Sequence, residues 1–234
     1  MITVLDTNSV WSLIDRRDSN HDKALAFIRT RKIGEICVLP TVSMEFRARY
    51  NKEFNALVAQ LISRIDSNLK DQLTLTEVNT FLSQISNTLA RQRSIDKTKL
   101  TRFTVSLHKF CRDFFKNRAN LSRIDIKDSL TSLKDRVEWK TAGSLDMLVE
   151  IGYDAPSMNG KESKNIIHKL IELDIKFNGP GDSMIAGEFF SILESHSTEQ
   201  FEFAAFDHDF IQKIEGAKQK LNFPNLNIVD IARI

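Results

Sequence analysis

The sequence predicts an α/β protein in which a parallel sheet is flanked by helices and interrupted by an all-helical insertion. At both ends of the chain, short apolar runs rich in β-branched residues alternate with amphipathic helical patterns, an order typical of parallel strands joined by helices. Residues 52–139 contain no proline or glycine, and their apolar residues recur at helical spacing. We therefore expect residues 1–50 and 161–234 to form the sheet domain and residues 51–160 to form the insertion.

Each element of the predicted sheet domain has its own local signal. Short apolar runs that end at polar residues or proline predict strands, and they occupy residues 2–6, 35–39, 201–206 and 226–229. Cap residues followed by helical periodicity predict helices, which begin near residue 9 and cover residues 24–28, 41–50, 161–176, 183–193 and 207–214. The Asn-Gly-Pro-Gly turn at residues 178–181 stops one helix and places Asp182 at the start of the next.

Charge is segregated along the chain. The net charge is +2, but residues 50–140 hold 17 Lys or Arg against 10 Asp or Glu, a local balance of +7 that leaves −5 for the rest. Basic side chains flank an apolar stripe of Phe103, Leu107, Phe110 and Phe114; they are Arg102, Lys109, Arg112 and Lys116. This helix either contacts nucleic acid or presents a solvated face.

Cysteine usage and hydropathy bear on the cellular setting. Cys37 and Cys111 form no CxxC spacing, so we expect neither a disulfide framework nor a zinc site. The chain opens on a strand-like run without the features of an export signal, and no segment approaches the roughly 20 apolar residues of a membrane span. We expect a cytoplasmic protein that does not bind membranes.

Four acidic residues stand where predicted elements meet. Asp6 and Asp207 end strands, Asp182 begins a helix, and Glu45 lies in the first turns of the helix after the second strand. Because the carboxyl ends of parallel strands share one edge of a sheet, these residues can converge there. Such a cluster repels itself unless hard divalent cations neutralise it, which predicts Mg²⁺ or Mn²⁺. The alternative is that the aspartates are only N-caps.

A metal-loaded carboxylate cluster supports phosphodiester hydrolysis. One ion lowers the pKa of a bound water, and a second stabilises the leaving oxygen. No nucleophilic side chain is required. The sequence therefore predicts a hydrolase without a covalent intermediate.

Four segments resemble the acidic motifs of PIN-domain nucleases, in the order typical of that family. They are residues 4–8 (VLDTN), 42–45 (VSME), 181–186 (GDSMIA) and 206–210 (FDHDF). The resemblance covers roughly residues 1–50 and 165–234. It implies a compact parallel-sheet domain, Mg²⁺ or Mn²⁺, and single-stranded RNA as substrate. It also implies metal binding by Asp6, Glu45 and Asp182, and by Asp207 either directly or through water.

The chain departs from the family pattern in three places. Ala205 stands where many members carry Thr or Ser, Asp209 supplies an extra carboxylate and a further metal-ligand candidate, and the stretch 51–160 exceeds the connections of compact members. Arg47 and Arg49 follow Glu45 closely, so we expect them either to contact a phosphate backbone or to be ordinary surface charges.

Three functions stay open from the sequence. The favoured one is an endoribonuclease, with a toxin or defence role because toxin ribonucleases are the largest class of PIN domains; an antitoxin or other protein partner and a homo-oligomer are then open questions. A catalytically silent PIN-like module that binds RNA or protein is the second. A haloacid-dehalogenase-type phosphohydrolase is the third, but that chemistry needs an aspartate where this chain has Asn8.

Overall fold

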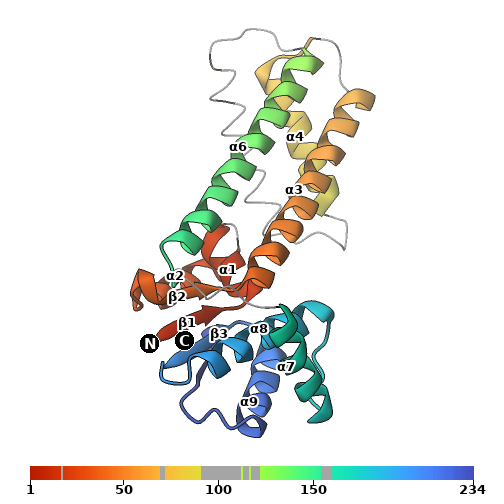
Figure 1. The fold of residues 1–234 in the computed structure, drawn as a ribbon. Helices are drawn as coiled ribbons and strands as arrows, with labels where there is room; N and C mark the ends of the chain where they lie inside the picture. The colour runs from red at the N-terminus through yellow and green to blue at the C-terminus, as the bar shows by residue number, and fades with distance from the viewer. Residues whose placement is uncertain (17, 69–71, 91–111, 113–115, 117–121, 154–159) are drawn as a thin grey trace. The chain divides into compact units, whose positions relative to one another are not determined.

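The structure, a computed structural model, describes residues 1–16, 18–68, 72–90, 112, 116, 122–153 and 160–234 (Figure 1). These residues form two compact units. The sheet unit comprises Met1–Arg16, Asn20–Ala48 and the described part of 142–234, and the helical unit comprises residues 18–19 with the described part of 49–141. Two long helices, α3 (Pro40–Asn68) and α6 (Arg123–Glu150), contribute residues to both units.

A four-stranded parallel sheet forms the centre of the sheet unit. Its strands lie in the order β2-β1-β3-β4, and they are β1 (Ile2–Leu5), β2 (Ile36–Val38), β3 (Phe201–Ala205) and β4 (Asn227–Asp230). The N-terminal strand pairs with β3, so that Leu5 lies opposite Ala204. Both ends of the chain therefore build one sheet, and the predicted α/β class with parallel strands is confirmed.

Helices flank this sheet. They are α1 (Thr7–Ile14), α2 (His21–Arg29), α7 (Gly160–Glu172), α8 (Pro180–Ser195) and α9 (His208–Lys220), with short 3₁₀ turns at Ile33–Glu35 and Ile231–Arg233. Phe189 of α8 packs on Phe203 of β3 with ring centroids 4.9 Å apart, and Phe203 contacts Phe210 of α9 at 5.5 Å. These aromatic contacts, one tilted and one edge-on, join α8 and α9 to β3.

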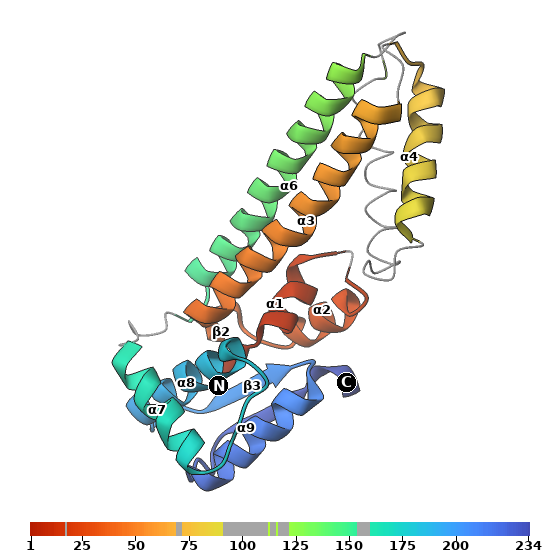
Figure 2. The same ribbon diagram turned by 90° about the vertical axis from the view of Figure 1, so that its right-hand side faces the viewer.

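Helix α7 lies along α8 (Figure 2). A glycine allows the close approach: a Cβ at Gly187 would lie 2.8 Å from the carbonyl oxygen of Ser163 and 2.8 Å from Ile167 Cγ1. Any larger residue at position 187 would push the two helices apart.

Several observed helix boundaries differ from the predicted ones. Helix α1 begins at Thr7 and not near residue 9, because Asp6 is its N-cap. Helix α3 begins at Pro40, a residue suited to the first helical position, and continues to Asn68 because no proline or glycine interrupts it. Helix α8 begins at Pro180 with Gly179 as its N-cap. Asp182 therefore lies in the first turn and does not start the helix, which corrects the sequence-based expectation.

In the helical unit, two helices begin with reciprocal capping bonds. Thr74 and Glu77 exchange such bonds before α4 (Leu75–Ala90), and Ser122 and Asp125 do the same before α6. Buried apolar residues include Val58, Ile65, Val78, Ile126 and Leu130. No helix in the described ranges is long and apolar enough to cross a membrane.

The predicted basic and aromatic stripe falls mostly outside the described residues. This applies to Arg102, Phe103, Leu107, Lys109, Phe110 and Phe114. Arg112 and Lys116 are described, and both are exposed.

Candidate active site

Asp6 is held at the carboxyl end of β1. It is the N-cap of α1, where its Oδ1 accepts a 2.8 Å hydrogen bond from the backbone N–H of Ser9. The side chain is only 3% exposed. Burial raises the pKa of Asp6 from 3.8 to about 6, and the negative charge of Asp207 adds to the rise. Asp6 thus caps α1 and also belongs to the acidic cluster.

Glu45 reaches this edge from the second turn of α3. The hydroxyl of Thr7, the residue after Asp6, donates a 2.6 Å hydrogen bond to Glu45 Oε2. On its other side the Glu45 carboxylate lies against the backbone of Gly181, where a Cβ would come within 1.7 Å of Oε1. Glu45 therefore sits between the start of α1 and the first turn of α8.

Asp182 and Asp207 complete the cluster. Asp207 is the N-cap of α9, and its Oδ1 accepts a 3.1 Å bond from the N–H of Phe210. The pKa of the half-buried Asp182 is raised by burial first, then by the charges of Asp207 and Glu45, while Lys213 lowers it. The mutual influence of these charges shows that the four predicted carboxylates share one region at the carboxyl edge of the sheet.

The oxygen-only character of this set suits a hard divalent cation. Carboxylates are the ligands that Mg²⁺ and Mn²⁺ prefer. Burial raises the pKa of Asp6 and Asp182 most, the charges of neighbouring carboxylates add to the rise, and a bound cation would offset both effects. Within the described residues, no three or more His, Cys, Asp or Glu side chains are gathered tightly enough to hold a metal ion. Binding would thus require small side-chain movements toward the ion.

Asp209, Arg47 and Arg49 are the other predicted site residues on the segments that carry these carboxylates. Asp209 is exposed in the first turn of α9. Arg47 is exposed and forms an ion pair with Asp146 of α6. Arg49 is half-buried and belongs to the helical unit.

Glu188 is a carboxylate of this region that the sequence reading missed. It is 6% exposed, and its oxygens accept hydrogen bonds from the backbone N–H of Thr41 at 3.1 Å and from its hydroxyl at 2.6 Å. Burial raises its pKa, and the charge of Glu45 adds to this rise. A signal was available, since Glu188 is the one charged residue in the buried stretch 185–193 of α8.

Lys213 is the second missed residue. Its ammonium donates to the side-chain oxygen of Asn178, and its charge lowers the pKa of Asp182. Both partners are about 30 residues or more away along the chain, so local spacing carried no signal for this role. The cluster thus has one positive neighbour that the sequence did not reveal.

Comparison of the chain with protein-family models, with curated proteins and with solved structures gave no significant match.

Proposed function

We propose that the protein is a metal-dependent endoribonuclease of the PIN type that hydrolyses phosphodiester bonds in single-stranded RNA. One observation carries this proposal: four carboxylates from four separate segments lie within electrostatic reach of one another at one edge of a parallel sheet, where burial first, and then the charges of neighbouring carboxylates, raise the pKa of Asp6 and Asp182. In the same proposal the segment 51–160 is an all-helical insertion, and the protein acts in the cytoplasm as a toxin or defence nuclease.

The chain's own residues would hold the reacting groups in place. Asp6, Glu45, Asp182 and Asp207 would supply oxygen ligands to Mg²⁺ or Mn²⁺, which when bound lowers the pKa of a water and neutralises charge on the phosphate. Thr7 orients Glu45 through its 2.6 Å hydrogen bond. Glu188 fixes the first turn of α3, the helix that carries Glu45.

A cleavage assay tests this function. Labelled single-stranded RNA and DNA would be incubated with the purified protein in Mn²⁺ or in EDTA. We expect RNA cleavage in Mn²⁺ only, and a loss of at least about 100-fold in Asp182→Asn because a ligand is removed. The matched control is Asp22→Asn, an exposed aspartate in the first turn of α2, which should retain activity.

The assay also separates the rival function. A catalytically silent module would bind RNA or a protein partner without metal-dependent turnover. Cleavage that persists in Asp182→Asn would remove the proposed site.

A further inference from the structure

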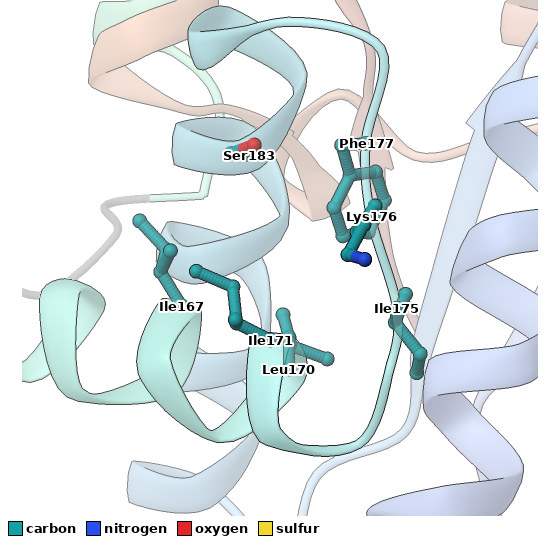
Figure 3. Close-up of a pocket in the computed structure, with 7 residues that line it drawn as sticks. All are labelled: Ile167, Leu170, Ile171, Ile175, Lys176, Phe177 and Ser183. Carbon is teal, nitrogen blue, oxygen red and sulfur yellow. The ribbon is translucent and has the colours of Figure 1, made fainter.

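A cavity of about 300 Å³ lies in the sheet unit between α7, the turn after it and the start of α8 (Figure 3). Its aliphatic walls are Ile167, Leu170, Ile171 and Ile175. Phe177, Lys176 and Ser183 complete the lining. We call it the α7–α8 cavity.

Backbone hydrogen bonds fix the walls of this cavity. At the end of α7, the N–H of Ile175 donates to the carbonyl of Leu170 and the N–H of Asp174 donates to that of Ile171, while Asp174 adopts a left-handed conformation with φ 55°. This is the Schellman ending, which brings the residue after the turn against the last turn of the helix. These bonds hold Ile175, one wall of the cavity, in a fixed place after α7.

The cavity adjoins the carboxylate cluster through two links. Ser183 directly follows Asp182 on α8. The ring of Phe177 packs edge-on against Phe210 at 5.5 Å, and the N–H of Phe210 donates to Asp207. A molecule inside the cavity would therefore lie close to any phosphate held at the acidic site.

The chemistry of the lining suits a flat, uncharged ring attached to a negative group. Aliphatic side chains and the Phe177 ring offer apolar contact to a π-face, which favours bases of any sequence. The Ser183 hydroxyl already donates to the carbonyl of Gly179. Lys176, which pairs with Asp174 at 3.4 Å, lines the wall, and Lys213 lies close enough to Asp182 to lower its pKa. Both ammonium groups can attract a phosphate attached to that ring.

We propose that the α7–α8 cavity binds one nucleobase of the RNA strand, next to the phosphate held at the carboxylate cluster. This inference rests on the proposed ribonuclease function and names its substrate more closely. A base can enter only when it is not stacked in a duplex. The substrate is thus RNA with an unpaired base beside the cleaved bond, and hairpins are cut in their loops.

A combination of modified RNA and cavity variants tests this. The substrates are a single-stranded RNA oligonucleotide and a series carrying one abasic residue at each position around the cleaved bond. With the wild-type protein, one abasic position should lower cleavage roughly tenfold, the effect of losing one stacked base. Equal cleavage of the whole series would overturn the proposal.

The variant arm uses Ile171→Trp, which fills the cavity from a residue that is 53% exposed. Cleavage of intact RNA should fall roughly tenfold, whereas cleavage of the sensitive abasic RNA should stay as in the wild type, because the two changes remove one interaction. His168→Trp, at an exposed α7 position outside the lining, is the control. Equal losses on both substrates would contradict base binding in the cavity.

Binding measured in EDTA separates this inference from the proposed function. If the affinity for RNA falls with the same abasic residue and with Ile171→Trp, but no cleavage occurs in Mn²⁺, base binding stands and the nuclease function fails. If cleavage occurs but the affinity for RNA is unchanged by the abasic residue and by Ile171→Trp, the nuclease function is supported and base binding in the cavity is contradicted. The experiment with abasic RNA needs only wild-type protein. Equal cleavage of the whole series would therefore overturn the proposal even if Ile171→Trp does not fold.

Discussion

Asp6 is both the N-cap of α1 and a buried member of the acidic cluster. Its carboxylate satisfies the N–H of Ser9, yet it is buried within reach of the charge of Asp207. An asparagine could satisfy the same N–H without carrying a charge. The charged aspartate therefore lowers the stability of the folded protein at neutral pH.

This cost gives a prediction for Asp6→Asn. Since the pKa of Asp6 is 3.8 ordinarily and about 6 in the folded protein, the folded state keeps a proton that the unfolded state loses between these pH values. The stabilisation is complete below pH 4 and is lost as pH rises through 6, a change of about 3 kcal/mol. In urea unfolding measured in EDTA, the free energy of unfolding of Asp6→Asn should rise relative to that of the wild type as the pH rises from 4 to 6. A constant difference between the two proteins would contradict the raised pKa.

Glu188 acts through Thr41, so we expect it to be a positioning residue for Glu45. Glu188→Ala removes both acceptors from the start of α3 and should lower cleavage by about tenfold. Glu188→Gln keeps an amide oxygen for Thr41 and should restore most of the activity. Rates at saturating RNA would be compared for the three proteins.

The control for this prediction is Glu202→Gln. Glu202 is equally buried, but it pairs with Arg31 and Asn227 away from the cluster. Breaking a buried ion pair should cost about 3 kcal/mol of stability and leave the rate of the folded protein unchanged. Equal activity losses in Glu188→Gln and Glu188→Ala would indicate a role for the Glu188 charge itself.

At the scale of elements, the first turn of α8 is shaped by the side chain of another helix. Gly181 has no positive φ, so its backbone would accept alanine. What excludes a side chain is the Glu45 carboxylate of α3, which lies where the Cβ would be. The contact between these two helices thus sets the distance from Glu45 to Asp182.

Gly181→Ala should therefore separate stability from activity. The added methyl group would displace Glu45 and lower cleavage by more than about tenfold, while the gain in helix propensity limits the stability loss. Gly216→Ala on α9 is the matched control, because its Cβ would meet nothing within 4 Å. That control should gain up to about 1 kcal/mol and keep its activity. Thermal unfolding and cleavage rates would be measured for both variants.

At the scale of the whole molecule, local patterns predicted the parallel strands, and the N-caps observed at Asp6 and Asp207 were the alternative to metal binding that the sequence left open. Strands and N-caps depend on adjacent residues, so local patterns contain them. Local patterns did not predict that Thr41 would be bound by Glu188 or that Lys213 would influence Asp182. Those contacts join residues far apart in sequence and depend on how α3, α8 and α9 pack. The cavity could not be predicted either, because it depends on how α7 and α8 pack together, and the hydrophobic periodicity of the sequence does not determine that packing.

The uneven charge of the chain leads to the last prediction. Residues 50–140 carry a net +7 and the remainder −5, so we expect residues 91–118 to supply phosphate contacts that the acidic remainder does not. Replacing Arg102, Lys109, Arg112 and Lys116 together with glutamine should weaken RNA binding. Each lost contact should flatten the dependence of log affinity on log salt by about 0.7. Cleavage at saturating RNA should be largely retained.

The competing interpretation assigns the same segment to a dimer or partner interface through Phe103, Leu107, Phe110 and Phe114. In that case the four glutamine substitutions would leave RNA affinity and its salt dependence unchanged. Phe110→Asp would instead alter the mass measured by light scattering, because a charge in an apolar interface opposes association. Filter binding at several salt concentrations, combined with the mass of both variants, decides between an RNA-binding arm and an interface.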